Sequence, residues 1–266
     1  MKMSCRCALI VFTVFLVIVP NIHAGAVLDG IRQSGVLRVG VTGDAPPLNV
    51  TDKTGKIIGM DADIAALIAS NMNVELKFVK MSFHKLLPAL RDKKIDMIIS
   101  GMTMTMDRNL DVAFVGPYYS SGKGILTRTD KIADLQKDDA LNSGAFTVAV
   151  LKDSTSQRFM TQSAPKASLK LTESYDAAIG MLLAGKVDAV VADLPFCAFN
   201  AYRYRDKGLV SGESPLSFEP LGIAVREDAL LINWLDNFIE VLKGSGALKL
   251  IHAKWFKDGS WISQLP

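Results

Sequence analysis

The residues best suited to bind a small molecule stand at the ends of two apolar runs that are typical of buried strands. Ser100 and Gly101 follow the first run, and Asp193 closes the second. Ligands of open α/β sheets bind outside the carboxyl ends of the strands. The segment after the first run, 101–114, is rich in hydroxyl groups and carries Arg108. If the two strands belong to lobes that face each other, we expect their ends to line a shared cleft.

The two strand ends belong to segments that resemble each other. Residues 90–101 read LRDKKIDMIISG, and residues 182–193, 92 positions later, read LLAGKVDAVVAD. Both follow an amphipathic helical stretch and carry Lys, a β-branched residue and Asp before an apolar strand. Internal similarity of this kind indicates two βαβ halves of like construction. A chance likeness between two apolar strands is the alternative.

Short β-rich runs alternate with helical stretches from Val36 onward, which predicts βαβ units, a mostly parallel sheet and an α/β fold. The expected strands are 36–41, 74–80 and 95–100, and the expected helices are 59–72, 82–94, 194–204, 228–246 and 247–256. Ser82 stands where an N-cap is expected. Asp61 and Asp63 stand in the first turn of their helix, where the helix dipole favours anions.

Two stretches punctuated by Gly, Pro and Ser separate the halves. They are 116–124 and 214–225. Such residues mark turns and loops. We therefore expect the chain to cross between lobes twice.

The N-terminal segment, residues 1–24, has the layout of a secretory signal peptide. Lys2 and Arg6 precede an apolar stretch of about a dozen residues, which is shorter than the roughly 20 residues that cross a bilayer as a helix. Small residues follow, so cleavage is expected after Ala24 or Ala26. A retained membrane anchor is the alternative.

The composition and the missing motifs exclude several classes of protein. The 266 residues carry a formal net charge of +3, from 30 basic and 27 acidic side chains that are interspersed, which does not indicate nucleic-acid binding. His84 and His252 are isolated, His23 lies in the signal peptide, and no CxxC or HExxH spacing occurs. We therefore expect no metal and no cofactor. There is also no GxSxG, Walker or GxGxxG motif.

Cysteine usage leaves no intramolecular disulfide. Cys5 and Cys7 lie in the signal peptide, so Cys197 remains alone in the mature chain. We expect Cys197 to be a small buried hydrophobic residue, with a reactive thiol as the alternative.

Four stretches together resemble one family. They read SGVLRVGVTGDAPPL (34–48), GKIIGMDADIAALIA (55–69), KKIDMIISGMTMTMDRNLDVAFVGPYY (93–119) and GKVDAVVADLPF (185–196). In this order, behind a signal peptide, they are similar to the extracellular solute-binding proteins of family 3, which serve ABC uptake of polar amino acids. The resemblance implies a two-lobed α/β periplasmic-binding fold of type II, with two hinge crossovers.

The resemblance also implies an organisation and a role. Residues 25–119 plus 220–266 would form lobe 1, and residues 120–219 would form lobe 2. The protein is then expected to be a monomer in the periplasm that binds an amino acid as its small-molecule ligand, closes on it by hinge motion and delivers it to an ABC transporter permease. It would be no enzyme and would need no cofactor.

In this family, an Arg after the first-lobe loop clamps the α-carboxylate of the ligand, and the resemblance places this role on Arg108. Thr103 and the backbone of Gly101 would complete the clamp, next to Ser100. A guanidinium suits this role because it offers two parallel N–H donors to a carboxylate. An ion pair on the surface is the alternative for Arg108.

The family's second-lobe Asp, which accepts from the α-ammonium group, corresponds to Asp193, whose alternative role is to cap the helix that follows. Phe83 corresponds to the aromatic residue that covers one face of the ligand, with core packing as the alternative. Ser154 and Thr155, in LKDSTS, correspond to the loop at a helix start that contacts the carboxylate. Plain N-capping is their alternative.

The first loop departs from the family pattern. Many members have an aromatic residue where this chain has Ala45. The neighbouring Asp44 is therefore expected either to meet a side chain of the ligand or to complete a turn with Gly43.

Three stretches also resemble cyclohexadienyl dehydratase, an exported enzyme of the same fold that removes water and carbon dioxide from prephenate or arogenate. They are VLRVGVTGD, ISGMTM and WFKDGSW (255–261). The reaction needs a general acid. The resemblance places that acid three residues beyond Asp193, where this chain has Phe196. A binding protein is therefore the expected function, and the dehydratase is the alternative.

Overall fold

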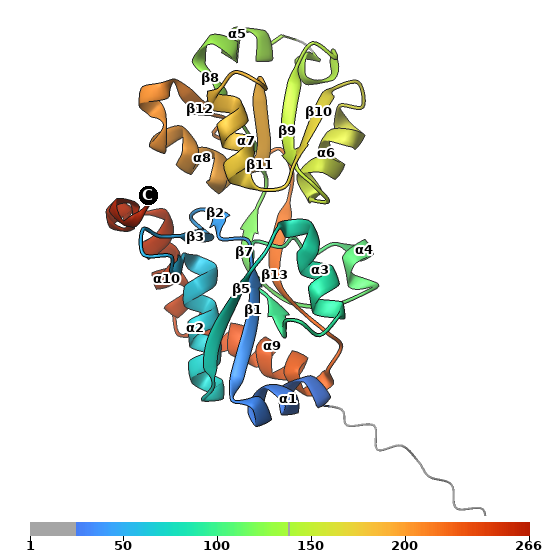
Figure 1. Ribbon diagram of the computed structural model, residues 1–266, viewed down its shortest axis with the longest axis vertical. Helices are drawn as coiled ribbons and strands as arrows, with labels where there is room; N and C mark the ends of the chain where they lie inside the picture. The colour runs from blue at the N-terminus through green and yellow to red at the C-terminus, as the bar shows by residue number, and fades with distance from the viewer. Residues whose placement is uncertain (1–24, 138) are drawn as a thin grey trace, which may run out of the picture.

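The computed structural model describes residues 25–137 and 139–266. The expected signal peptide, residues 1–24 with Cys5, Cys7 and His23, lies outside the described residues. The described chain forms two lobes, each built around a five-stranded mixed sheet, which lie end to end along the long axis of the molecule (Figure 1). Among the described residues, no helix has both the length and the apolar character needed to cross a membrane.

Lobe 1 is built on the sheet β5-β1-β6-β13-β7. Its strands are β1 (Val36–Val41), β5 (Glu75–Lys80), β6 (Met97–Ile98), β7 (Ala113–Ser121) and β13 (Glu219–Val225). The first three run parallel, and β13 runs antiparallel to its neighbours. Its helices are α1 (Ala26–Ser34), α2 (Met60–Met72), α3 (Phe83–Arg91), α4 (Met106–Asn109), α9 (Ala229–Gly244) and α10 (Ala247–Phe256), followed by the 3-10 helix η4 (Gly259–Gln264).

Lobe 2 repeats this plan in the sheet β10-β9-β11-β8-β12. Its strands are β8 (Lys123–Arg128), β9 (Thr147–Leu151), β10 (Ser168–Thr172), β11 (Ala189–Asp193) and β12 (Leu209–Ser211). Strands β9, β10 and β11 are parallel, and β8 is antiparallel to both of its neighbours. Its helices are η1 (Thr129–Lys131), α5 (Ile132–Leu135), η2 (Ala140–Asn142), α6 (Thr155–Ser163), α7 (Tyr175–Leu183), α8 (Leu194–Arg203) and η3 (Arg205–Lys207).

A small third sheet lies at the end of lobe 1 that faces lobe 2 (Figure 1). Its strands are β2 (Asp44–Ala45), β3 (Asn49–Thr51) and β4 (Ile57–Ile58). Ala45 packs into the hydrophobic core of lobe 2, among residues of α7 and α8. The first loop of the chain therefore touches both lobes.

The expected repeat is confirmed by matching hydrogen bonds in the two sheets. In lobe 1, Asp96 makes two hydrogen bonds with the backbone of Arg38 on β1. The backbone N–H of Asp96 donates to the carbonyl oxygen of Arg38 at 2.8 Å, and the backbone N–H of Arg38 donates to the carboxylate of Asp96 at 2.9 Å. In lobe 2, Asp188 makes the same pair of bonds with Thr147 on β9, at 2.8 and 2.9 Å. The aspartates are the corresponding residues of the two similar segments, so the likeness is structural.

An arginine completes the match in each lobe. Arg226 follows β13 and Arg128 ends β8, and the two strands hold the same place in their sheets. Each guanidinium donates to two carbonyl oxygens. Arg226 donates to Leu90 at 3.0 Å and to Ile95 at 2.7 Å. Arg128 donates to Leu182 at 3.1 Å and to Val187 at 3.0 Å. These acceptors are again corresponding residues.

The two crossovers are more regular than the sequence indicated. The stretch 116–124 is mostly strand rather than loop, because β7 runs to Ser121 and β8 starts at Lys123. The second crossover returns from β12 to β13, whose first residue, Glu219, pairs with Ser121. A side chain at Gly122 would place its Cβ 2.2 Å from the carbonyl oxygen of Ser217, so the two crossovers pass in direct contact.

Two further expectations were wrong in detail. The strand 95–100 is reduced to β6, because the residues after Ile98 turn into the loop that forms the cleft. Ser82 occupies the N-cap position of α3, but its side chain makes no capping bond. The last two helices are confirmed within two residues of their expected limits.

Candidate functional site

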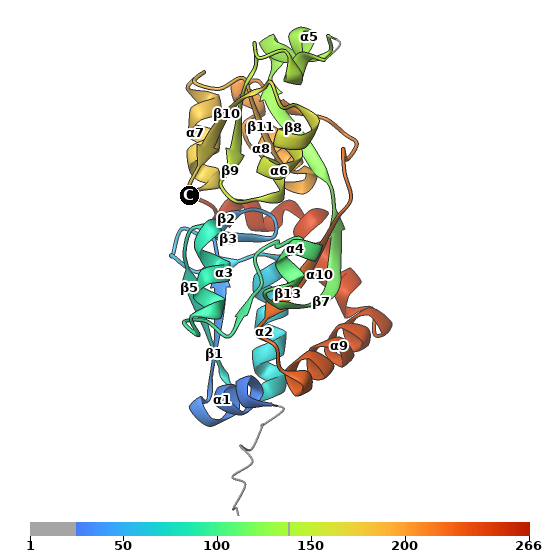
Figure 2. The same cartoon turned by 90° about the vertical axis from the view of Figure 1, so that its right-hand side faces the viewer.

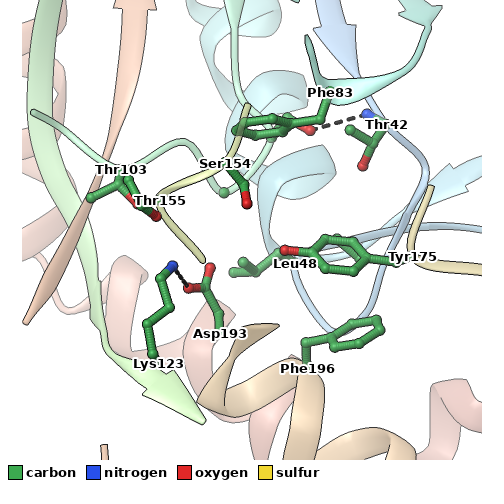
Figure 3. A pocket seen from close by; sticks show the side chains of 13 residues that line it. Thr42, Leu48, Phe83, Thr103, Lys123, Ser154, Thr155, Tyr175, Asp193 and Phe196 are labelled. Atoms are coloured by element: carbon green, nitrogen blue, oxygen red, sulfur yellow. Dashed lines mark hydrogen bonds and ion pairs between the residues drawn. The ribbon is translucent and has the colours of Figure 1, made fainter. Parts of the chain in front are cut away.

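A pocket lies between the two lobes, where the strands of both sheets end (Figure 3). Lobe 1 and its small sheet supply Thr42, Ala45, Leu48, Phe83, Ser100, Gly101 and Thr103, and lobe 2 supplies Lys123, Ser154, Thr155, Tyr175, Asp193 and Phe196. The structure thus brings together seven of the nine expected site residues. Arg108 and Asp44 are outside the lining.

The floor of the pocket on the lobe 1 side rests on a buried polar network. The hydroxyl of Ser100 accepts the backbone N–H of Thr42 at 3.0 Å. The amide of Asn49 donates to Asp61 at 2.7 Å, and the phenol of Tyr118 donates to the other carboxylate oxygen at 2.8 Å. Burial raises the pKa of Asp61 to about 6, although these donors act to lower it. This network fixes the backbone turn from which Gly101 and Thr103 extend.

The lobe 2 side carries the charges of the pocket. Lys123 Nζ lies 2.7 Å from Asp193 Oδ1 and 3.5 Å from Glu219 Oε2, and all three side chains are buried (Figure 3 shows the first two). Asp193 occupies the N-cap position of α8 but makes no side-chain capping bond. The capping alternative for Asp193 is therefore not realised, and its carboxylate faces the pocket.

Arg108 lies in α4, beside the pocket and on its outer side, where it lines a neighbouring cavity. Its guanidinium donates to the carbonyl oxygens of Thr103 at 2.9 Å and Asp153 at 3.3 Å, and lies 5.4 Å from the ring centre of Phe83. Burial lowers the pKa of Arg108 to about 10, with a further contribution from the nearby Arg158. Arg108 therefore remains charged at neutral pH and bridges the two lobes.

Ser154 and Thr155 stand at the N-terminus of α6. The hydroxyl of Ser154 accepts the backbone N–H of Gln157 at 3.2 Å, so it does cap the helix, and both residues also line the pocket. The hydroxyls of Thr155 and Thr103 lie 3.2 Å apart across the cleft. The free N–H groups of a helix N-terminus favour anions, so this end of the pocket suits a carboxylate.

Aromatic and aliphatic side chains form the remaining walls. Phe83 begins α3 on one side, and Tyr175 and Phe196 lie on the other with ring centres 4.3 Å apart (Figure 3). Leu48 and Ala45 are the aliphatic residues of the lining. Phe83 lines the pocket and packs against the core of each lobe, so the core-packing alternative is realised.

Asp44 bonds across the lobes instead of completing a turn. Its Oδ2 accepts the backbone N–H of Tyr175 at 2.7 Å, at the start of α7. Burial raises the pKa of Asp44, while Thr42 and the Tyr175 N–H act to lower it. Its Oδ1 is buried with no hydrogen-bond partner among the described residues.

Further polar contacts join the rims of the two lobes. Arg158 on α6 lies 2.6 Å from Asp107 on α4, and His84 on α3 lies 3.2 Å from Glu173, which precedes α7. With the Arg108 and Asp44 bonds, these contacts hold the lobes together in a closed arrangement.

Sequence reasoning did not assign a binding role to Thr42, Leu48, Lys123 and Tyr175, which line the pocket, or to Glu219 and Asp61, which support it. Asp61 was placed in the first turn of a helix, correctly, but its complete burial was not foreseen. The lone Lys within the expected connector was the available indication for Lys123, since lysine is rarely buried without a partner. Cys197 is buried as expected, and burial raises the pKa of its thiol to about 12. No cluster of three or more potential metal-ligating side chains occurs within 25–137 and 139–266.

Two lobes of the same topology, two crossovers and a pocket enclosed between strand ends define a two-lobed binding protein of the periplasmic type. The chain belongs to the bacterial extracellular solute-binding proteins, family 3, whose sequence profile matches residues 37–258.

Known relatives include both binding proteins and an enzyme. An L-arginine-binding protein of Pseudomonas aeruginosa is 30% identical over 231 residues, which cover 83% of this chain and 87% of the relative. Cyclohexadienyl dehydratase of the same organism is 24% identical over 230 residues, covering 86% of each protein. The crystal structure of an ancestral amino acid-binding protein, described as a precursor of cyclohexadienyl dehydratase, superimposes with a TM-score of 0.80 at 34% identity, over 86% of this chain and 99% of that one.

Proposed function

We propose that this protein is the amino-acid-binding component of an ABC uptake system. The observation that carries the proposal is the pairing of opposite chemistries in one enclosed pocket: the carboxylate of Asp193 at its base, and the hydroxyls of Ser154 and Thr155 at the N-terminus of α6. An α-amino acid presents an ammonium and a carboxylate on one carbon atom, so it matches both. The relatives named as amino-acid-binding proteins support this reading.

In this proposal, each wall of the pocket has a role. Asp193 accepts from the α-ammonium, and Thr103, the Gly101 backbone and Thr155 donate to the α-carboxylate. Arg108 exchanges its bond to the Thr103 carbonyl for the carboxylate, because a charged acceptor binds a guanidinium more strongly than a neutral one. Phe83 covers one face of the ligand.

The proposed working cycle is hinge closure. The lobes, 25–119 plus 220–266 and 120–219, would move as two bodies about the paired crossovers, and contacts from both lobes to one ligand favour only the closed state. The mature protein would act as a monomer in the periplasm, after removal of residues 1–24, and pass its ligand to the membrane permease.

The dehydratase reaction is disfavoured by the residue at the position expected for its acid. Phe196 is 4% exposed and packs against Tyr175, so it supplies no proton. Asp193, a carboxylate in the lining, already accepts a hydrogen bond from Lys123 at 2.7 Å. We therefore propose that the protein does not turn over prephenate or arogenate.

A thermal-shift screen of the mature protein against the twenty amino acids tests the proposal, with prephenate and arogenate in the same plate. A ligand present at 100 times its Kd adds about 2.7 kcal/mol to the free energy of unfolding. Asp193→Asn is expected to abolish the shift, whereas Asp206→Asn, at an exposed site in η3, leaves it unchanged. No shift with any amino acid, or turnover of either cyclic acid, would refute the proposed function.

A further inference from the structure

One buried cation, Lys123, lies within 4 Å of two buried carboxylates, Asp193 and Glu219, at the base of the pocket. The side chain of Lys123 is 3% exposed, and those of Asp193 and Glu219 are 10% and 9% exposed. Lys123 makes its hydrogen bond to Asp193, at 2.7 Å. Its distance to Glu219 Oε2 is 3.5 Å, and this oxygen has no hydrogen-bond partner in the described part of the chain.

Glu219 is held in place by its surroundings. It begins β13 at the crossover, and its other carboxylate oxygen accepts the hydroxyl of Ser217 at 3.1 Å. Burial acts to raise the pKa of Glu219, but the nearby cation and hydroxyl groups together have a larger, opposite effect, so the pKa is below its usual value. These groups are Lys123 and the hydroxyls of Thr103, Thr155 and Ser217. Glu219 is therefore ionised at neutral pH.

Lys123, Asp193 and Glu219 together carry one formal negative charge in excess, and the nearby cation, Arg108, donates to the carbonyl oxygens of Thr103 and Asp153. An uncompensated buried charge is costly, whereas a buried group that is paired and hydrogen-bonded is tolerated. A second cation at this place would balance the two carboxylates. The α-ammonium of the proposed ligand brings that cation, but one oxygen of its acceptor, Asp193 Oδ1, is already bonded to Lys123.

We infer that Lys123 passes its hydrogen bond from Asp193 to Glu219 when the ligand's α-ammonium binds Asp193. This inference rests on the proposed function. Glu219 then acts as a positioning residue: it does not touch the ligand, but it receives Lys123 and so leaves Asp193 free for the ammonium. The shift is short, because Lys123 already lies 3.5 Å from the free oxygen of Glu219.

The arrangement favours ligands with an ammonium group over analogues with a hydroxyl group in its place. A hydroxyl can donate to Asp193, but it brings no charge to balance Glu219. The contribution of Glu219 to binding should therefore depend on the charge of the ligand and not on its side chain.

The test compares Glu219→Gln with wild type by isothermal titration, using the amino acid found in the screen and the 2-hydroxy acid with the same side chain. In the variant, Lys123 and Asp193 form a neutral pair, so the fold should be retained. We expect affinity for the amino acid to fall at least tenfold and affinity for the hydroxy acid, measured by displacement, to change less than threefold. Glu213→Gln, an exposed residue between β12 and β13, is the matched control and should change neither affinity.

Equal weakening of both ligands would overturn the inference, since it would make Glu219 a structural residue only. Unchanged affinity for the amino acid would overturn it as well. Glu219→Asp keeps the charge and should preserve the preference for the amino acid, which provides the same comparison if Glu219→Gln does not fold. Absence of amino-acid binding by the wild-type protein would instead contradict the proposed function, so the two failures are distinguishable.

Discussion

Asp96 in lobe 1 and Asp188 in lobe 2 hold the same place in their sheets, and each tethers the segment before a central strand to the neighbouring strand. A few residues later, the two segments diverge. In lobe 1, the loop after β6 brings Ser100 and Gly101 to the pocket, and the carboxylate of Asp61 is buried below the pocket surface. Lobe 2 ends its strand in a carboxylate that lines the pocket. The comparison teaches that the supporting framework is duplicated, while the chemistry at the strand ends differs between the lobes.

The largest expected effect comes from removing the cation of lobe 2. Lys123→Met leaves Asp193 and Glu219 buried without a counter-charge, and breaking a buried ion pair from one side costs about 3–5 kcal/mol. Urea unfolding of the variant should show this loss. The exposed Lys186→Met, in the same lobe, should change stability by less than about 0.5 kcal/mol. Similar stabilities for the two variants would mean that the charged base of lobe 2 is not essential to the fold.

Removal of the cation on the lobe 1 side should affect binding rather than folding. Arg108→Ala is expected to weaken amino-acid binding by about 3 kcal/mol, because the ligand carboxylate loses a desolvated partner. Isothermal titration measures the change, and Arg32→Ala, exposed on α1, is the control. A change of less than threefold in Kd would remove Arg108 from the binding site.

The buried carboxylate of lobe 1 should give stability a distinctive pH dependence. Burial raises the pKa of Asp61 from 3.8 to about 6, so between these values the folded protein holds a proton that the unfolded chain releases. Stability therefore falls as pH rises through this window, by up to about 3 kcal/mol from this group.

The opposite sign is expected in lobe 2. Burial acts to raise the pKa of Asp188, but the Thr147 N–H and Lys131 have a larger, opposite effect, so the pKa is below its usual value. Asp188 therefore stabilises the fold above the pKa that it has in the unfolded chain, and this stabilisation is lost as pH falls. Urea unfolding from pH 3.5 to 7 should show a shallower fall for Asp61→Asn and a shallower rise for Asp188→Asn than for wild type. Parallel curves for all three proteins would contradict both assignments.

The smallest effect concerns the two tethers themselves. Asp96→Ala should cost about 2 kcal/mol, because this carboxylate is 6% exposed and accepts bonds from the backbone and guanidinium of Arg38. Asp188→Ala should cost about 1 kcal/mol, because its carboxylate is 20% exposed and its cation, Lys131, is on the surface. Denaturant midpoints rank the two variants, and the reverse order would contradict the assignment of the larger energy to the more buried carboxylate.

The sequence predicted those parts of the molecule that depend on local pattern. The repeat, the last two helices and the end of β11 at Asp193 were found because periodicity and the order of residues along the chain reveal them. Lys123 was missed because its partner is 70 positions away, and no local pattern links the two. The crossovers were read as loops because Gly, Pro and Ser punctuate them, whereas pairing between β7 and β13 decides their conformation.

The site was predicted as a set of residues but not as an arrangement. Seven of nine expected residues line the pocket. Arg108 has the expected residue type and position, yet its contacts with Thr103 and Asp153 follow from how the lobes meet, which the sequence does not state. Asp44 was expected either to meet a side chain of the ligand or to complete a turn with Gly43, but its partner in the structure is the Tyr175 N–H of lobe 2.

The end of the chain also touches both lobes. Trp261 in η4 packs against Trp255 of α10 and stacks on Phe199 of α8, with ring centres 5.2 Å apart in the latter pair, and Arg203 donates to the carbonyl of Pro266 at 2.6 Å. Figure 2 shows this end of the chain lying at the level where the lobes meet. A separation of the lobes must pull the Trp261 indole off the Phe199 ring and admit water to it. Intrinsic fluorescence should therefore report on the separation of the lobes: the emission of Trp261 should move to longer wavelength when the lobes part, without any attached dye.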